Sequence, residues 1–455
     1  MNNTIVAIST APGIGGIGII RMSGENCFEV LEKIFKQKNA QDIEEIKGYS
    51  IKYGNIVEND QIIDEVLVSY FKAPKSYTAE NMCEINSHGG VVLMNKILDL
   101  CIRNGAELAE PGEFTKRAFL NGRMDLSQAE AVIDIINAKT DKEAKISLEQ
   151  LEGNLSEKIK QIRKTVISVM ADIEATIDYP EYDLEEVTNA KILKVLDEVD
   201  ILLDQLEKSF YNGKILREGI STAIIGRPNA GKSSLLNLIL NEERAIVTDI
   251  EGTTRDTIEE YISIEGVPLK IIDTAGIRTA SDEVERIGVK KAIEIANKSD
   301  VVIAIFDINK ELNEEDKEIL KLLENKNAII ILNKIDLERK VDLKTLEKYN
   351  KPIVEISTKT KDGVDALYKE ISNLFKLKEI ANDGETIVTN VRHKNIILNS
   401  RDNLNKARQT IIDQMPIDMI STHLKEILEE LGKITGETVT EDVIAEIFSK
   451  FCLGK

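Results

Sequence analysis

The sequence contains no apolar run that approaches the roughly 20 residues needed to cross a bilayer. It also lacks a basic start followed by an apolar core, the pattern of a secretory signal peptide. The four cysteines, Cys27, Cys83, Cys101 and Cys452, are scattered, with no CxxC pair. These absences argue against a membrane span, a disulfide framework and a zinc site, and they favour a reducing, cytoplasmic environment.

Basic residues are outnumbered, with 59 Lys and Arg against 79 Asp and Glu, which gives a formal net charge of -20. A uniformly acidic surface repels phosphate backbones, so contact with nucleic acid requires a local basic patch or a second protein. The composition is 42% hydrophobic and 30% charged, which is typical of a globular protein. A chain of 455 residues exceeds one ordinary core and predicts about three domains.

Hydrophobic periodicity divides the chain into four segments. Residues 1–118 predict a mixed α/β domain, and residues 119–213 predict helices. Residues 214–377 alternate strands and helices, as in a parallel sheet with crossover helices, and residues 378–455 return to helix. We therefore expect a multidomain α/β plus all-α protein, in which an α/β domain is inserted into a helical domain whose first and last parts pack together.

Within these segments, several elements stand out. Strands are expected at Thr4–Thr10, Ile17–Met22 and Glu65–Phe71. Apolar residues recur every three or four positions from Leu151 to Ile177, which predicts one long helix, and Lys191–Leu206 predicts a second. Glycines at 13, 15 and 18 match a dinucleotide fingerprint, but a strand follows them where the fingerprint requires a helix.

The strongest motif is Gly226-Arg-Pro-Asn-Ala-Gly-Lys-Ser233, which matches the phosphate-binding loop G-x4-G-K-[ST] in full. An apolar strand, Ile220–Ile225, precedes it, and a helix, Ser234–Leu240, is expected to follow. Backbone N–H groups of such a loop surround phosphates at the positive end of the helix dipole. Lys232 would neutralise β- and γ-phosphate charge, and the Ser233 hydroxyl would ligate Mg²⁺.

Three further motifs follow expected strands in the same segment. Asp273-Thr274-Ala275-Gly276 follows Lys232 after 40 intervening residues. There Asp273 can reach the Mg²⁺ shell, and the Gly276 N–H can reach the γ-phosphate. In Asn333-Lys334-Ile335-Asp336, the Asp336 carboxylate would accept from the two N–H donors of guanine, which adenine lacks. Ser357-Thr358-Lys359 fits the last base-contacting loop. The sequence thus predicts a GTP-binding domain.

Gly252-Thr253-Thr254-Arg255-Asp256 lies between the phosphate loop and Asp273, where a threonine can ligate Mg²⁺ while the γ-phosphate is present. Ile277 occupies the place of the water-orienting glutamine of Ras-like proteins. Isoleucine cannot hold a water, and no arginine finger can be assigned from the sequence. Hydrolysis therefore requires another positive charge and another polar group, for which Ser281–Arg286 offers candidates.

Together these motifs resemble the tRNA-modification GTPase family often called MnmE or TrmE. The resemblance rests on GRPNAGKSS, GTTRD, DTAGIR, SDEVERIG and NKID, and it covers essentially the whole chain. It includes Ala11–Arg21, His88–Gly90, Pro111–Phe114, Arg117–Gly122, Asp125–Ala131 and Ile447–Lys455.

For the GTPase domain, the resemblance implies hydrolysis assisted by K⁺ in place of an arginine finger. The implied K⁺ ligands are Asn229, Thr248, Ile250 and Thr253, and the implied Mg²⁺ ligands are Ser233 and Thr254. Glu285 matches the family's water-positioning glutamate and, with Lys232, is the expected catalytic residue. The GTP-binding residues expected overall are Asn229, Ala230, Gly231, Lys232, Ser233, Ser234, Thr248, Asp249, Ile250, Gly252, Thr253, Thr254, Asp273, Thr274, Ala275, Gly276, Asn333, Lys334, Asp336, Ser357, Thr358 and Lys359.

For the rest of the chain, the resemblance implies an N-terminal domain that dimerises and binds a tetrahydrofolate one-carbon derivative, in its 5,10-methylene or 5-formyl form. Positions matching that pocket are Arg21, Glu84, Arg123, where the family usually has lysine, and Lys455. Cys452 matches a cysteine proposed to take part in the modification. With a flavin-dependent partner, MnmG (GidA), the family modifies C5 of the wobble uridine (position 34) of certain tRNAs.

Other functions remain open from the sequence. One is an assembly or signalling GTPase without modification chemistry, which would bind no tetrahydrofolate. A second is a ribosome-associated GTPase whose helices bind RNA, against which the acidic charge argues. A third is a folate-dependent transferase that acts alone, without GTP or a partner.

Overall fold

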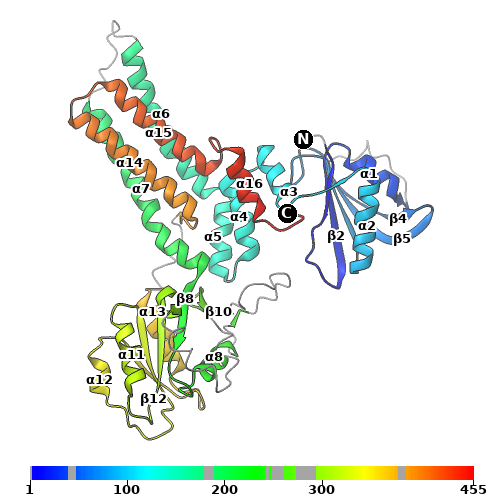
Figure 1. The fold of residues 1–455 in the computed structure, drawn as a ribbon. Coiled ribbons are helices and arrows are strands. Elements are labelled where there is room, and N and C mark those ends of the chain that lie inside the picture. The colour runs from blue at the N-terminus through cyan, green and yellow to red at the C-terminus, as the bar shows by residue number, and fades with distance from the viewer. Residues whose placement is uncertain are drawn as a thin grey trace. The chain divides into compact units, whose positions relative to one another are not determined.

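The computed structural model describes residues 3–38, 48–178, 189–241, 245–246, 260–272, 294–377 and 386–455. The chain folds into two compact units (Figure 1). The first comprises Met1–Ile133, Gln150–Asn189 and Asn403–Lys455, and the second comprises Asp134–Glu149 and Ala190–Asp402. Among the described residues, no helix is both long enough and apolar enough to cross a membrane.

The first unit contains a seven-stranded sheet in the order β3-β4-β5-β6-β2-β1-β7. All neighbours are antiparallel except β1 and β7. Its strands are β1 (Ile5–Ile8), β2 (Gly15–Ser23), β3 (Phe35–Gln37), β4 (Tyr49–Glu58), β5 (Gln61–Phe71), β6 (Met82–Gly89) and β7 (Glu107–Leu108), and its two helices are α1 (Cys27–Ile34) and α2 (Val91–Arg103). The expected strands at 4–10, 17–22 and 65–71 correspond to β1, β2 and β5.

Alternation along the strands gives this sheet two different faces. Ile20, Val68 and Ile85 point to one face and are fully buried with residues of α1 and α2. The opposite face carries a row of paired positions, Ile51↔Ser69, Ser69↔Glu84 and Glu84↔Arg21. We call it the open face, because its apolar members Tyr49, Ile51 and Leu67 are exposed.

The helices of the first unit pack around apolar stripes. They include α3 (Glu113–Leu120), α6 (Asn154–Asp178), α15 (Ile417–Thr435) and α16 (Glu441–Ser449). α6 and α15 lie side by side, with Ile159 and Leu424 buried on the two helices (Figure 1). This pairing joins helical segments from before and after the second sheet.

The expected single helix through Leu151–Ile177 is wrong at its start. Leu151 ends α5 (Asp141–Leu151), and α6 begins only at Asn154. Between them Gly153 has φ +100°, a left-handed conformation that cannot continue a right-handed helix. The second expected helix is longer than predicted, because α7 runs from Asn189 to Glu218.

The second unit contains another seven-stranded sheet, in the order β14-β13-β12-β8-β11-β10-β9. Neighbours from β14 to β11 are parallel, whereas β10 is antiparallel to both β11 and β9. The strands are β8 (Ile220–Ile225), β9 (Ala245–Ile246), β10 (Glu260–Ile264), β11 (Val267–Ile271), β12 (Val301–Asp307), β13 (Ala328–Asn333) and β14 (Ile353–Ile356). The connecting helices include α8 (Lys232–Leu240), α11 (Glu314–Leu323), α12 (Leu343–Glu347) and α13 (Val364–Leu374).

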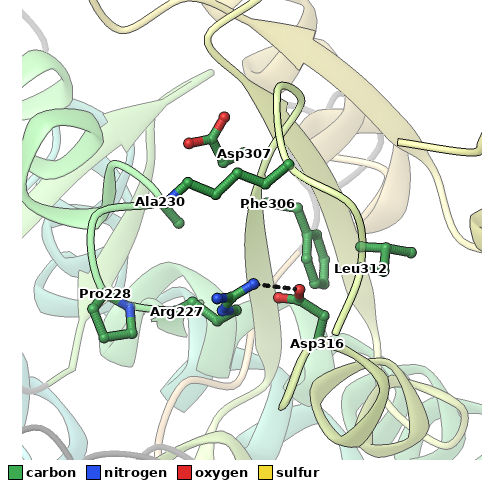
Figure 2. A pocket seen from close by; sticks show the side chains of 8 residues that line it. Arg227, Pro228, Ala230, Phe306, Asp307, Leu312 and Asp316 are labelled. Carbon is green, nitrogen blue, oxygen red and sulfur yellow. Dashed lines mark hydrogen bonds and ion pairs between the residues drawn. The ribbon is translucent and has the colours of Figure 1, made fainter. Parts of the chain in front are cut away.

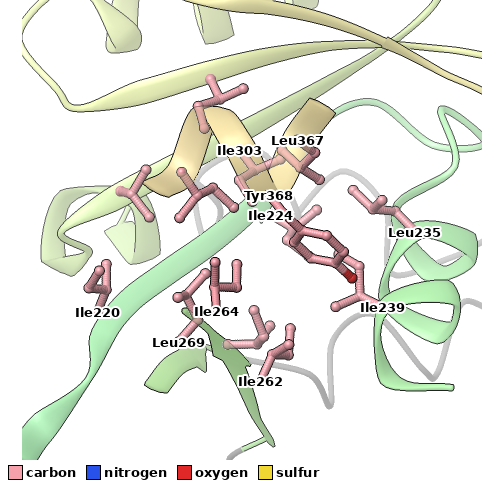
Figure 3. Packing of buried hydrophobic residues seen from close by; sticks show 14 of the residues in the cluster. Ile220, Ile224, Leu235, Ile239, Ile262, Ile264, Leu269, Ile303, Leu367 and Tyr368 are labelled. Atoms are coloured by element: carbon pink, nitrogen blue, oxygen red, sulfur yellow. The ribbon is translucent and has the colours of Figure 1, made fainter. Parts of the chain in front are cut away.

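The central strands of this sheet are apolar throughout because helices cover both faces. On one face, shown in Figure 3, buried residues of the sheet pack with α8 and α13, among them Ile224, Ile303, Leu235, Ile239, Leu367 and Tyr368. On the other face, Leu320 and Leu323 of α11 pack with Ile330. The carboxyl ends of β8, β12 and β13 therefore meet along one edge.

Long helices accompany this sheet in the second unit. In α7, a Cβ on Gly213 would lie 2.1 Å from the Val388 carbonyl oxygen, so the segment before α14 (Val391–Ile412) approaches α7 closely. Arg401 of α14 forms ion pairs with Asp200, Asp204 and Glu207 of α7. The predicted fold class, an α/β domain, a helical domain and an inserted P-loop GTPase domain, is confirmed.

Candidate functional site

The phosphate loop connects β8 to α8 at the carboxyl edge of the second sheet. A Cβ on Gly226 would lie 2.4 Å from the Ile305 carbonyl oxygen, and a Cβ on Gly231 would lie 2.0 Å from Asn333 Nδ2. Both distances are far inside van der Waals contact, so only glycine allows the loop backbone to lie so close to β12 and β13. This close approach to β12 and β13 determines the curved path of the loop backbone.

Lys232 and the first turn of α8 complete the loop. Lys232 Nζ donates to the carbonyl oxygens of Gly226 and Arg227, at 2.8 Å each. Gly231, with φ +111°, is the N-cap residue of α8 and has no side chain that could cap the helix. Ser233 and Ser234 follow in that turn, where N–H groups at the positive end of a helix suit an anion.

The predicted guanine loops lie against the phosphate loop. Asn333 is fully buried; its Nδ2 donates to the Ala230 carbonyl oxygen at 2.8 Å, and its Oδ1 accepts from Thr358 N at 3.1 Å. Ser357 Oγ donates to Asp336 Oδ1 at 2.8 Å, and Lys359 follows in the same turn. The structure therefore brings the phosphate loop and both base-contacting loops into one hydrogen-bonded network.

Lys334 links the same loops by charge. Its Nζ donates to the Asn229 carbonyl oxygen at 2.9 Å and to Asp307 Oδ2 at 2.6 Å. Burial alone would raise the pKa of Asp307, but the hydrogen bonds from Lys334 and from the Asn309 N–H outweigh it and lower the pKa below its usual range. Asp307 is thus an ionised carboxylate beside the loop, with a side chain only 8% exposed.

Sequence reasoning missed two carboxylates here, Asp307 and Asp316. Arg227 NH1 pairs with Asp316 Oδ2 at 3.0 Å across a small pocket, as Figure 2 shows. Asp316 also closes the N-terminal cap of α11 by accepting from Asn313 N at 3.0 Å. An aspartate at the end of an apolar strand, such as Asp307, was the signal that could have drawn attention to one of them.

Eleven of the predicted GTPase-site residues lie outside the described residues. They are Thr248, Asp249, Ile250, Gly252, Thr253, Thr254, Asp273, Thr274, Ala275, Gly276 and Glu285.

A second cluster lies on the open face of the first unit. Arg21 pairs with Glu84, with NH2 to Oε1 at 2.8 Å and Nε to Oε1 at 2.9 Å. The Arg21 guanidinium lies 5.4 Å from the ring centre of Tyr77, and that of Arg123 lies 4.9 Å from the same ring. Arg123 NH1 donates to the Tyr77 carbonyl oxygen at 2.8 Å. The guanidinium groups of both arginines therefore lie close to the Tyr77 ring.

The C-terminal tail reaches the same cluster. The Gly454 carbonyl oxygen accepts from Arg21 NH1 at 3.3 Å and from Ser9 Oγ at 3.0 Å. A Cβ on Gly454 would lie 2.4 Å from the Ile8 carbonyl oxygen, so the tail is pressed against β1. Lys455 is the next residue, and the Cys452 side chain is exposed. Arg21, Glu84, Arg123 and the tail are therefore brought together from distant parts of the sequence.

His88, in the predicted motif His88–Gly90, lies at the end of β6. Its Nδ1 lies 2.7 Å from Asp64 Oδ1, and its backbone N–H donates to Asp64 Oδ2 at 2.9 Å. This contact orients the ring at the strand end, four residues beyond Glu84 on the same strand.

Comparison with known proteins covers both units. The family model described as MnmE helical domain matches residues 126–452, and the one described as GTP-binding protein TrmE N-terminus matches residues 4–123. The tRNA modification GTPase MnmE of Acetivibrio thermocellus is 50% identical over 457 residues, covering 100% of this chain and 99% of the relative. The protein of the same name from Clostridioides difficile is 48% identical, covering 100% of both chains.

A solved G domain of the T. maritima FeoB iron transporter is 26% identical, with a TM-score of 0.26, over 34% of this chain and 98% of its own. The two family models together cover nearly all of the described chain, and both relatives match along the full length of this chain. The protein belongs to the MnmE (TrmE) family of tRNA modification GTPases.

Proposed function

We propose that this chain is a potassium-dependent GTPase of the cytoplasm that modifies C5 of the wobble uridine of certain tRNAs. It acts as a homodimer with the flavin-dependent partner MnmG and uses a tetrahydrofolate one-carbon unit. The observation that carries the proposal is the assembly of Arg21, Glu84, Arg123 and the C-terminal tail around Tyr77 in a chain that also has a GTPase domain.

In the GTPase site, the described residues fit a magnesium nucleotide. The Ser233 hydroxyl, next to Lys232 in the first turn of α8, is an oxygen ligand of the kind that Mg²⁺ takes. Asn229 supplies an amide oxygen for K⁺. When bound, these cations neutralise charge that develops on the phosphates. Lys232 binds the β- and γ-phosphates, Asp336 selects guanine, and Glu285 orients the attacking water.

In the open-face cluster, the donor set fits a folate. Guanidinium groups hold the carboxylates of a folate tail, and a carboxylate such as Glu84 accepts from the amino group of a pterin ring. The centres of the Tyr77 and Phe114 rings lie 5.4 and 5.6 Å from the guanidinium carbon of Arg21. Arg123, in the place of the family's lysine, offers a planar, bidentate contact where lysine offers a point charge.

The open face also supports the proposed homodimer. Tyr49 and Ile51 are each 66% exposed, and Tyr53 and Leu67 pair with one another beside them. Adjacent exposed apolar side chains on one sheet face are typical of a protein interface. A second copy on this face would cover them next to the folate cluster.

Within the second unit, the segment Asp134–Glu149 contacts the GTPase sheet and supports coupling between hydrolysis and modification. Lys139 Nζ lies 3.6 Å from the centre of the Tyr261 ring on β10, and Ile146 packs on the apolar cluster under the sheet. β10 follows directly after the predicted switch Gly252–Asp256 along the chain. A change at the switch would therefore reach the helical segment through Tyr261.

Calorimetric titration with 5-formyltetrahydrofolate tests the folate proposal. Wild type is expected to bind, and Arg21→Ala and Glu84→Gln are expected to weaken binding at least about tenfold, because each removes a charge-assisted contact. Arg339→Gln, in an exposed pair with Glu355 in the GTPase domain, is the matched control and is expected to bind as wild type does. No binding by wild type would contradict the proposal and favour an assembly or signalling GTPase.

The coupling is tested separately with Asp273→Asn. This variant is expected to lose both GTP hydrolysis and nucleoside modification in the presence of the flavin-dependent partner. Unchanged modification without hydrolysis would show that the two activities are independent.

A further inference from the structure

We propose that Asp307, which lies outside the GTP-binding motifs, is a positioning residue that holds the phosphate loop and the guanine loop together through Lys334. It acts on the GTPase activity of this family, and the inference does not depend on the folate or potassium proposals.

The position of Asp307 is set by the sheet. It is the last residue of β12 and pairs in register with Asn333, the last residue of β13 and the first of the guanine motif. Its side chain is only 8% exposed. One carboxylate oxygen, Oδ1, accepts from the Asn309 N–H at 3.0 Å, which leaves Oδ2 for the Lys334 ammonium at 2.6 Å.

Lys334 transmits this anchor to the phosphate loop. Its ammonium lies between Asp307 Oδ2 and the Asn229 carbonyl oxygen, so a single charged group joins β12, the guanine loop and the phosphate loop. Figure 2 shows Asp307 and the loop residue Ala230 among the residues that line the small pocket beside the phosphate loop. Asp307 does not need to touch the nucleotide, because it acts on the residue that does.

The backbone at both ends of this link is strained. Asn229 has φ +61° and Lys334 has φ +71°, a left-handed region that residues other than glycine seldom adopt. Such conformations persist only where surrounding contacts hold them. The Lys334 ammonium, which Asp307 holds, donates to the Asn229 carbonyl oxygen and so connects these two residues.

The consequence is specific to nucleotide binding. Without the carboxylate, the Lys334 ammonium, 31% exposed, gains more from water than from one carbonyl oxygen, and the Asn229 carbonyl loses its donor. The loop then relaxes from the shape that fits the phosphates. Lys232 and Ser233 are untouched, and bound nucleotide would hold the loop, with Asn229, in its productive shape. The turnover rate of the saturated enzyme is therefore maintained while affinity falls.

The test is Asp307→Asn, an isosteric change whose side-chain oxygen can still accept from Asn309 N. We expect the Kd for a fluorescent GDP analogue and the KM for GTP to rise about tenfold, the loss typical of a charged hydrogen bond. We expect kcat to stay within about twofold and the thermal midpoint without nucleotide to fall only slightly, because the variant also removes the stabilising pair with Lys334. The matched control is Glu314→Gln on α11, in an exposed ion pair with Lys317, and it is expected to leave both constants unchanged.

A double-mutant cycle separates positioning from a general structural role. If Asp307 acts through Lys334, then Asp307→Asn has little further effect in a Lys334→Met background. Wild-type affinities in Asp307→Asn would overturn the proposal. So would an undiminished effect in the Lys334→Met background, or a fall in the nucleotide-free thermal midpoint that accounts for the lost affinity.

Discussion

Close packing around the backbone of the phosphate loop predicts that its Gly231 cannot be replaced by a residue with a side chain. The methyl carbon added by Gly231→Ala would lie only 2.0 Å from Asn333 Nδ2, far inside van der Waals contact. Asn333 would have to leave the Ala230 carbonyl oxygen that it holds. The glycine is therefore required by the neighbouring guanine motif as well as by the phosphates.

We expect Gly231→Ala to weaken binding of a fluorescent GDP analogue at least about 100-fold, because it breaks the contact between the two loops. Equilibrium titration by fluorescence measures it. Gly16→Ala serves as the control, since nothing lies within 4 Å of its added carbon. Binding of GDP by Gly231→Ala as tight as in wild type would contradict this account of the loop.

Glu143 gives the second prediction at the residue scale. Burial raises its pKa from 4.5 to about 7, although the Lys139 N–H that it accepts from favours the charged form. Because the folded-state pKa is raised, the folded protein binds this proton more tightly than the unfolded chain. The resulting stability is fully present below about pH 4.5 and is lost as pH rises through about 7.

Glu143→Gln should therefore raise the thermal midpoint at pH 8 relative to wild type, with a smaller difference at pH 5. The glutamine oxygen can still accept from Lys139 N, so the turn before α5 is kept. Glu149→Gln, further along the same helix, is the control. An equal shift of the midpoint at both pH values would show that Glu143 does not titrate as described.

At the scale of elements, hydrophobic periodicity predicted which helices and strands exist better than it predicted where each one begins and ends. The helix α6 could be predicted because its apolar residues recur about every 3.6 positions. The central strands of the second sheet could be predicted because they are continuous apolar runs. The break at Gly153 could not be predicted, because Leu151 continues the apolar stripe in register on the preceding helix. Only the glycine between them could have indicated a boundary.

The stripe of α6 makes a testable contribution to stability. Ile159 is fully buried where α6 lies beside α15, and Ile159→Ala is expected to lower the free energy of unfolding by about 2–5 kcal/mol. Ile167, on the same helix, is 46% exposed, and Ile167→Ala is expected to cost less than about 1 kcal/mol. Urea unfolding followed by circular dichroism compares them. Equal costs would contradict the assignment of the buried face.

At the same scale, the motifs located the loops but not their anchors. The phosphate and guanine motifs specify residues that meet the nucleotide, and local patterns sufficed to find Lys232, Asn333 and Asp336. Asp307 belongs to none of these motifs. Its place at the end of an apolar strand could have drawn attention to it, but its role depends on the pairing between β12 and β13, which no local pattern encodes. A single sequence therefore does not reveal the role of residues that act only by positioning other residues.

For the whole molecule, the folate cluster shows the limit of sequence reasoning. Arg21, Glu84 and Gly454 come from β2, β6 and the C-terminal tail, and nothing in composition or spacing relates them. Family resemblance alone suggested Arg21 and Glu84, together with Arg123 and Lys455, and the contact of Gly454 was not predicted. The assignment of Asp134–Glu149 to the GTPase unit was not predicted either, because the segment reads as an ordinary part of the helical domain.

The most direct test of the central claim is GTP hydrolysis in KCl against NaCl at equal ionic strength and at several protein concentrations. We predict strong acceleration by potassium alone, increasing with protein concentration, because K⁺ would stand in for the missing arginine finger as two GTPase domains meet. Equal rates in the two salts would contradict the potassium mechanism and leave a GTPase whose catalytic charge comes from elsewhere.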